Sequence, residues 1–149
     1  MKSAKIHLEI TIAASKEHIW CILLGHETFS QWATAFKKGS YFEGEITKEG
    51  GIVSFLDPDQ NGIRSRVMDY KQDETITFLH HAILNRCTLD TASREAKKWI
   101  GLKETYLLKA LDNNKCLFTV DVDIAVEYEE MFAKSWKRAM ENLKRLCEF

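Results

Sequence analysis

Four polar side chains, all in segments that alternate like β-strands, are of types that carry out general acid–base chemistry: Arg66, His80, Glu104 and Tyr106. They can work together only if they converge in one pocket, and the alternation alone leaves open which face of its strand Arg66 occupies. The chain has no phosphate-binding glycine loop, no Gly-x-Ser-x-Gly motif and no His-Glu-x-x-His motif. An enzyme of the cyclase or hydrolase type, using His80, Tyr106 or Glu104, is therefore a hypothesis without a supporting motif.

Metal binding is not expected. His80 and His81 are adjacent in a predicted strand, so their side chains point to opposite faces and cannot chelate one ion unless the strand has a bulge there. Residues 57–62 match the opening of a calcium loop, but the twelfth position of such a loop requires a glutamate and is Met68 here. Asp, Pro, Asn and Gly in this order instead favour a hairpin turn.

Composition narrows the classes of protein. A length of 149 residues fits one domain, and a net charge of −1 gives no general attraction to nucleic acid. No apolar run is long enough for a membrane span, and the N-terminus lacks the apolar centre of a signal peptide. The four cysteines have no paired spacing and are expected to be reduced. These observations predict a cytoplasmic protein with no cofactor.

The elements that must position the polar residues are strands, followed by one long helix. Apolar residues recur at spacings of three and four through residues 127–149, which predicts an amphipathic helix. Alternation and turn residues predict antiparallel strands. The predicted strands are residues 5–12, 41–47, 52–56, 63–70, 75–82, 102–111 and 115–125.

Two short helices are expected after the first strand. Ser15 is the predicted N-cap of one, which Gly25 ends, and Thr28 is the predicted N-cap of the other, which ends at Gly39. The order of elements predicts an α+β fold. We expect a curved antiparallel sheet of six to seven strands, wrapped around the C-terminal helix.

A ligand pocket between the sheet and the long helix is the main candidate site. Pockets for small molecules are mostly apolar with a few fixed polar groups, and His80 and Tyr106 are suitable polar groups. The same side chains could instead fill the interior as a close-packed core, so both interpretations stay open. The candidate ligand-binding residues are Trp32, Phe36, Phe55, Met68, Phe78, His80, Trp99, Tyr106, Phe132, Trp136 and Met140.

Residues 85–100 form the only long irregular segment, and they have two interpretations. The segment could be a lid over the pocket, anchored by Trp99, or a solvated connection between strands. A helical turn is expected within residues 92–99.

Two stretches resemble a known superfamily. Residues 12–20 read IAASKEHIW and are followed by FSQW at 29–32, and residues 136–148 read WKRAMENLKRLCE. With an Asp-Pro-Asp turn, Trp-Ile-Gly at 99–101 and Glu-Thr-Tyr at 104–106, these resemble the helix-grip proteins of the START-like (SRPBCC) superfamily. Within it, the likeness is to the homologues of the activator of heat-shock-protein-ninety ATPase, and to small stand-alone bacterial members.

The resemblance implies a pocket between the sheet and the last helix. Superfamily members bind lipids, hormones or polyketides, catalyse a few reactions or act as co-chaperone modules, and fold alone does not choose among these roles. Our leading hypothesis is a module that binds a small hydrophobic or amphipathic ligand. Contact with a chaperone is the second hypothesis and enzyme activity the third, and the sequence leaves open whether the protein is a monomer or a homodimer.

Overall fold

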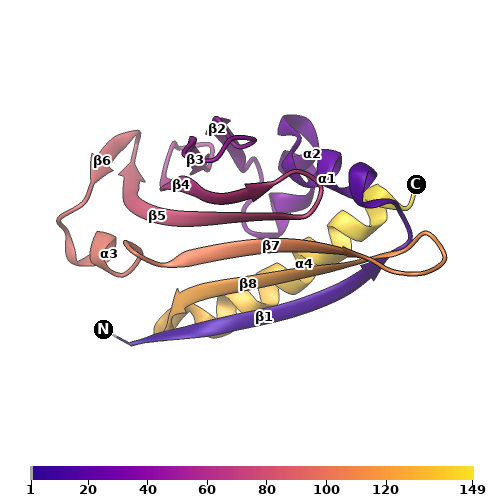
Figure 1. The fold of residues 1–149 in the computed structure, drawn as a ribbon. Helices are drawn as coiled ribbons and strands as arrows, with labels where there is room; N and C mark the ends of the chain where they lie inside the picture. Colours follow the sequence, from indigo (N-terminus) through magenta and orange to yellow (C-terminus); the bar gives the residue numbers. More distant parts are fainter. Residues whose placement is uncertain (1) are drawn as a thin grey trace.

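The chain folds into one curved antiparallel sheet that holds a long helix on its concave side (Figure 1). The computed structural model describes residues 2–149. The strands are β1 (Ser3–Ile12), β2 (Tyr41–Gly44), β3 (Ile52–Leu56), β4 (Gly62–Lys71), β5 (Thr75–Asn85), β6 (Thr88–Asp90), β7 (Lys103–Ala110) and β8 (Cys116–Ala125). The helices are α1 (Lys16–Leu24), α2 (His26–Trp32), α3 (Arg94–Lys97) and α4 (Glu129–Cys147), with 3-10 turns at Ala33–Ala35 and Val126–Tyr128.

The sheet order is β1-β8-β7-β5-β4-β3-β2, with β6 paired to the far end of β5. The predicted α+β helix-grip architecture is confirmed, with eight strands in the described chain instead of six to seven. The additional strand, β6, lies in the segment that we expected to be irregular. It is three residues long, so it carries too little alternation to be read from the sequence.

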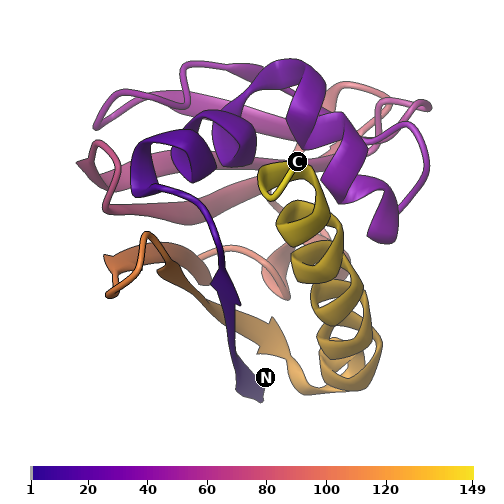
Figure 2. The same cartoon turned by 90° about the vertical axis from the view of Figure 1, so that its right-hand side faces the viewer.

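The C-terminal helix α4 buries one stripe of side chains, among them Trp136, Ala139, Met140 and Leu143, against the sheet and the N-terminal helices. Acidic Glu129 and Glu130 occupy its first turn and basic Lys144 and Arg145 its last, which suits the helix dipole. Figure 2 shows α1 and α2 beside the C-terminal end of α4. Trp32 of α2 also reaches Trp136 in the first half of α4, with ring centroids 5.9 Å apart.

One of the two predicted helix caps is confirmed and the other is wrong. The Ser15 hydroxyl accepts a hydrogen bond from the backbone N–H of His18 at 3.1 Å and caps α1. Thr28 does not cap α2, because that helix follows α1 directly and has Gly25 as its N-cap. The Thr28 hydroxyl instead donates to the carbonyl of Ile22 at 2.6 Å, and so satisfies an unpaired carbonyl near the end of α1.

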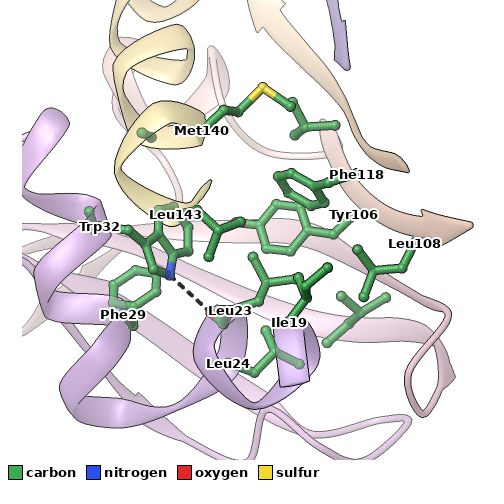
Figure 3. Close-up of a cluster of buried hydrophobic side chains, with 14 of the residues drawn as sticks. Ile19, Leu23, Leu24, Phe29, Trp32, Tyr106, Leu108, Phe118, Met140 and Leu143 are labelled. Carbon is green, nitrogen blue, oxygen red and sulfur yellow. Dashed lines mark hydrogen bonds between the residues drawn. The ribbon is translucent and has the colours of Figure 1, made fainter. Parts of the chain in front are cut away.

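The core lies between α1, α2, α4 and the middle of the sheet (Figure 3). Trp32, Phe78 and Phe118 are among its largest fully buried side chains. The indole N–H of Trp32 donates to the Leu23 carbonyl at 3.2 Å, which fixes α2 against α1. This part of the interior is closely packed, and Trp32 lies at its border with the cavity described below.

Strands β4 and β5 pair with two register shifts, which change which side chains face inward. Arg64 pairs with Ala82 but Ser65 pairs with His80, so His81 has no partner; Met68 is likewise left over between Val67 and Asp69. Each extra residue is a β-bulge, which interrupts the strict alternation of faces. As a result, Ile83 lies on the same inner wall as His80, although simple alternation would place them on opposite faces.

Candidate functional site

A cavity of about 440 Å³ lies between the sheet and the N-terminal half of α4, and it opens to solvent. Its floor and walls come from β3, β4, β5 and β7, from α2 and the turn after it, and from Phe132 and Trp136 of α4. The lining is mainly apolar. A volume of this size and character is typical of a binding site for one small molecule.

Aromatic rings form much of the wall. Trp136 lies between rings from two other elements: its ring centroid is 5.0 Å from that of Phe36 and 5.6 Å from that of Tyr106. Phe55 of β3 packs edge-on against Phe78 at 5.1 Å. Trp136 is thus almost fully buried, yet it borders open space and not only packed side chains.

The first polar feature of the wall is the pair formed by Glu104 and Tyr106 on β7. These residues are two apart on the strand, so they face the same side. The Tyr106 hydroxyl donates to Glu104 Oε2 at 2.8 Å. Burial raises the pKa of Glu104 to about 7, although the hydrogen bond from Tyr106 acts in the opposite direction. Near neutral pH, the wall therefore carries a carboxyl group that can gain or lose a proton.

The second polar feature is His80 on β5, which is 5% exposed. Its Nδ1 lies 2.7 Å from the hydroxyl oxygen of Ser65, its cross-strand partner on β4. Burial lowers the pKa of His80 to about 4; the charge of Asp123 opposes this shift and His81 adds to it. The imidazole is therefore neutral near pH 7.

The mouth of the cavity is marked by the exposed residues in its lining: Lys37, Asn61, Asn85 and Glu95. The Lys37 ammonium pairs with Asp57 at 3.0 Å and ties the segment after α2 to the β3–β4 hairpin. The hairpin itself is the predicted turn, with Asp57 Oδ1 accepting from the backbone N–H groups of Asp59 and Asn61 at 2.8 and 3.0 Å. The turn chemistry predicted for this segment is confirmed.

The segment around α3 is fastened to the start of α4. Trp99 stacks on Tyr128 with ring centroids 5.7 Å apart, and its indole N–H donates to Glu95 at 3.2 Å. The Tyr128 hydroxyl donates to the same carboxylate, and Lys98 pairs with Glu127 at 3.0 Å. The predicted helical turn is confirmed and Trp99 is an anchor, while the role of the segment as a lid stays a prediction.

The structure brings together most of the residues that the sequence predicted for the pocket. The predicted residues that line the cavity are Trp32, Phe36, Phe55, His80, Trp99, Tyr106, Phe132 and Trp136. Three others do not line it. Phe78 and Met140 are buried in the solid core, and Met68 is displaced by its β-bulge. Whether the lining residues bind a ligand stays a prediction.

The four acid–base candidates do not all converge. His80, Glu104 and Tyr106 share the cavity wall, but Arg66 is exposed on the other face of β4, so it takes no part. Sequence reasoning missed Phe29, Tyr41, Ile63 and Ile83 as lining residues. Phe29 and Ile63 are apolar positions in predicted elements, so extending the inward stripes would have found them, whereas Ile83 depends on a bulge.

The described residues hold neither a cluster of metal ligands nor a membrane-spanning helix. Within residues 2–149, no three histidine, cysteine, aspartate or glutamate side chains gather in a way that could hold a metal ion. No helix in the same part of the chain combines the length and apolar character needed to cross a membrane.

The chain resembles known proteins in structure but not in sequence. No protein-family model matches the chain, and no curated protein matches its sequence. Among solved structures, protein MLL2253 from Mesorhizobium loti is 10% identical with a TM-score of 0.74, the alignment covering 96% of each chain. The Aha1 dimer from Colwellia psychrerythraea is 16% identical with a TM-score of 0.68, over 98% of this chain and 97% of the other.

A third match is CalU16 from Micromonospora echinospora, 12% identical with a TM-score of 0.67, over 97% of this chain and 76% of the other. This chain has the helix-grip fold. The predicted resemblance to helix-grip proteins is thus confirmed, and at these identities the likeness concerns the fold alone. The predictions of chaperone contact and of monomer or homodimer stay predictions.

Proposed function

We propose that this helix-grip protein binds a small, mainly apolar molecule in the cavity between its sheet and α4. The observation that carries the proposal is the open space of about 440 Å³ beside Trp136, at the position where a closed core would be filled. Protein interiors are normally packed without voids larger than a water molecule. An aromatic-lined space of this size therefore supports binding rather than simple packing.

The lining also has the composition that small-molecule sites share. Rings such as Phe36, Phe55 and Phe132 are only partly buried, because they border the cavity. Covering them with a ligand would remove apolar surface from water, which contributes about 25 cal/mol for each Å². The polar groups His80 and Glu104 would then fix the orientation of the ligand.

The proposal is tested by titrating the protein with a neutral, environment-sensitive dye such as phenylnaphthylamine. Ile63 lies in the cavity wall, so Ile63→Trp should fill the space and weaken dye binding at least about tenfold. Ile52 lies on the neighbouring strand, outside the cavity lining, so Ile52→Trp is the matched control and should bind the dye normally. Equal binding by wild type and Ile63→Trp, or no binding by wild type, would refute the proposal.

A second candidate function is acid–base catalysis on the bound molecule. The observation that favours it is the Glu104 carboxyl, whose pKa of about 7 suits a group that accepts and donates a proton near neutral pH. Turnover of a panel of aryl esters and aryl ketones by wild type, lost in Glu104→Gln while dye affinity is kept, would support it. Binding without turnover by either protein would leave binding alone as the function.

A further inference from the structure

The cavity wall contains polar atoms that have no partner within the protein. Among residues 2–149, neither Nε2 of His80 nor Nε1 of Trp136 makes a hydrogen bond. No buried side-chain nitrogen or oxygen in this part of the chain is both sealed from solvent and unsatisfied, so these two atoms must be reachable. Both residues line the cavity and are almost fully buried, so solvent or a ligand reaches these two nitrogens from the cavity.

The hydrogen bond to Ser65 decides which nitrogen of His80 carries the proton. Ser65 is fully buried, and its hydroxyl oxygen has no side-chain or backbone partner except Nδ1 of His80. If Nδ1 carried the proton, it would donate to Ser65, and the hydroxyl hydrogen of Ser65 would be left buried without an acceptor. That costs roughly 1–3 kcal/mol. The hydroxyl therefore donates to Nδ1, and the neutral ring carries its proton on Nε2.

The wall thus presents two N–H donors, from His80 and Trp136, and one adaptable group, Glu104. The Glu104 oxygen Oε2 accepts from Tyr106, and Oε1 has no partner among the described residues. Glu104 on β7 pairs with Phe78 on β5. His80 is two residues beyond Phe78 on the same strand, so it is the diagonal neighbour of Glu104, and residues in this relation are about 7–8 Å apart. The same space is therefore bordered by two hydrogen-bond donors, one from β5 and one from α4, and by the free carboxyl oxygen from β7.

We propose that the buried Ser65–His80 pair acts as a positioning device that holds His80 as an Nε2–H donor, and that the cavity consequently selects apolar molecules whose polar end is a neutral oxygen acceptor, such as an aryl ketone. This inference rests on the proposed binding function. The ketone oxygen accepts from the N–H groups, while a protonated Glu104 supplies a third donor. An ammonium group has no lone pair with which to accept from the two N–H donors, and it finds a partner in this wall only when Glu104 is ionised.

The first test examines the tautomer without any ligand. Nitrogen-15 chemical shifts and proton couplings of the His80 ring at neutral pH should show an unprotonated Nδ1 and a protonated Nε2 in wild type. In Ser65→Ala the ring should populate both tautomers, whereas His81→Phe, a change on the residue next to it in β5, should leave Nε2 as the protonated nitrogen of His80. A wild-type ring protonated on Nδ1 would overturn the inference.

The second test measures selectivity with three probes of the same shape: acetylnaphthalene, ethylnaphthalene and naphthylethylamine. The ratio of affinities for ketone over hydrocarbon should fall about tenfold in His80→Phe and about threefold in Ser65→Ala, because one hydrogen bond is lost or weakened. The ratio should be unchanged in His81→Phe, and at about pH 6, where Glu104 is mostly protonated, the amine should bind more weakly than the ketone in wild type.

The two proposals fail in different ways. If the neutral dye and all three probes bind with a ratio that His80→Phe does not change, the cavity binds ligands but the inferred selectivity is refuted. Tighter binding of the amine than of the ketone at about pH 6 would also refute it. If the dye and the probes all fail to bind wild type, the binding function itself is refuted, and the selectivity with it.

Discussion

Replacing Glu104 by glutamine should stabilise the protein at neutral and alkaline pH and leave it unchanged at acid pH. In the folded protein the pKa of Glu104 is about 7, against 4.5 for an unburied glutamate. Between these values the folded state binds more protons than the unfolded state, so the contribution of Glu104 to stability falls as pH rises from about 4.5 to about 7. Glutamine keeps the shape and an oxygen for Tyr106, but it never ionises.

The size of the effect follows from the two pKa values. A difference of one pKa unit corresponds to about 1.4 kcal/mol, so the change from 4.5 to about 7 corresponds to about 3 kcal/mol. Water in the open cavity screens the carboxylate, which reduces the expected gain to about 2–3 kcal/mol. For a domain of this length, that gain raises the melting temperature by roughly 4–12 °C.

The pH dependence of the stability of Glu104→Gln should also show the contribution of His80. Its folded pKa of about 4 lies below the ordinary 6.5, so the unfolded state binds more protons in this range and the contribution of His80 to stability rises with pH from about 4 to 6.5. In wild type the opposite slopes of His80 and Glu104 largely cancel over this range. In Glu104→Gln, only the rising contribution of His80 remains.

The assay is urea unfolding followed by circular dichroism at pH steps from about 4 to about 8. The matched control is Glu43→Gln, which removes a carboxylate from an exposed position on β2. We expect the curves of wild type and Glu104→Gln to meet at the acid end and to diverge above the ordinary glutamate pKa. A constant offset between them at every pH, or a loss of stability at alkaline pH, would show that burial does not raise the pKa of Glu104.

Three further predictions concern the framework around the cavity. Phe118→Ala should cost about 3–5 kcal/mol in urea unfolding, because Phe118 is fully buried, whereas Phe149→Ala should cost almost nothing at its fully exposed position. Ser15→Ala should cost about 1 kcal/mol through loss of the α1 cap, and Ser15→Asp should restore most of it. Tyr128→Phe should speed amide hydrogen exchange around Ala96 without changing global stability, and unchanged exchange there would mean that the bond to Glu95 does not hold α3.

The sequence predicted the elements that are long and strictly periodic. Helix α4 has several turns of repeating apolar positions, and β8 alternates over ten residues, so both were correctly placed. Where a single extra residue interrupts the alternation of a strand, the predicted direction of the side chains was wrong. Met68 looked like an inward residue because nothing in its neighbours reveals a bulge, and the pairing of β4 with β5 that creates it is a long-range event.

The polar chemistry of the cavity was predicted only in part. His80 and Tyr106 were correctly chosen as polar lining, since they interrupt apolar inward faces. The partnership of Ser65 with His80 was not predicted, because it depends on which residues the shifted register brings opposite each other. Thr28 showed the same limit: its residue type suits a cap, but the direct succession of α1 and α2 gave its hydroxyl another role.

The pairing of β1 with β8 has a consequence for how the chain is made. Ile6 pairs with Val122 and Ile12 with Cys116, so among the described residues β1 has its sheet neighbour in a strand that is synthesised much later. Pairings between residues so distant in sequence form late, because closing the intervening loop is entropically costly. On the ribosome, β1 therefore remains an unpaired alternating strand until β8 has emerged, and during that time it is exposed to aggregation.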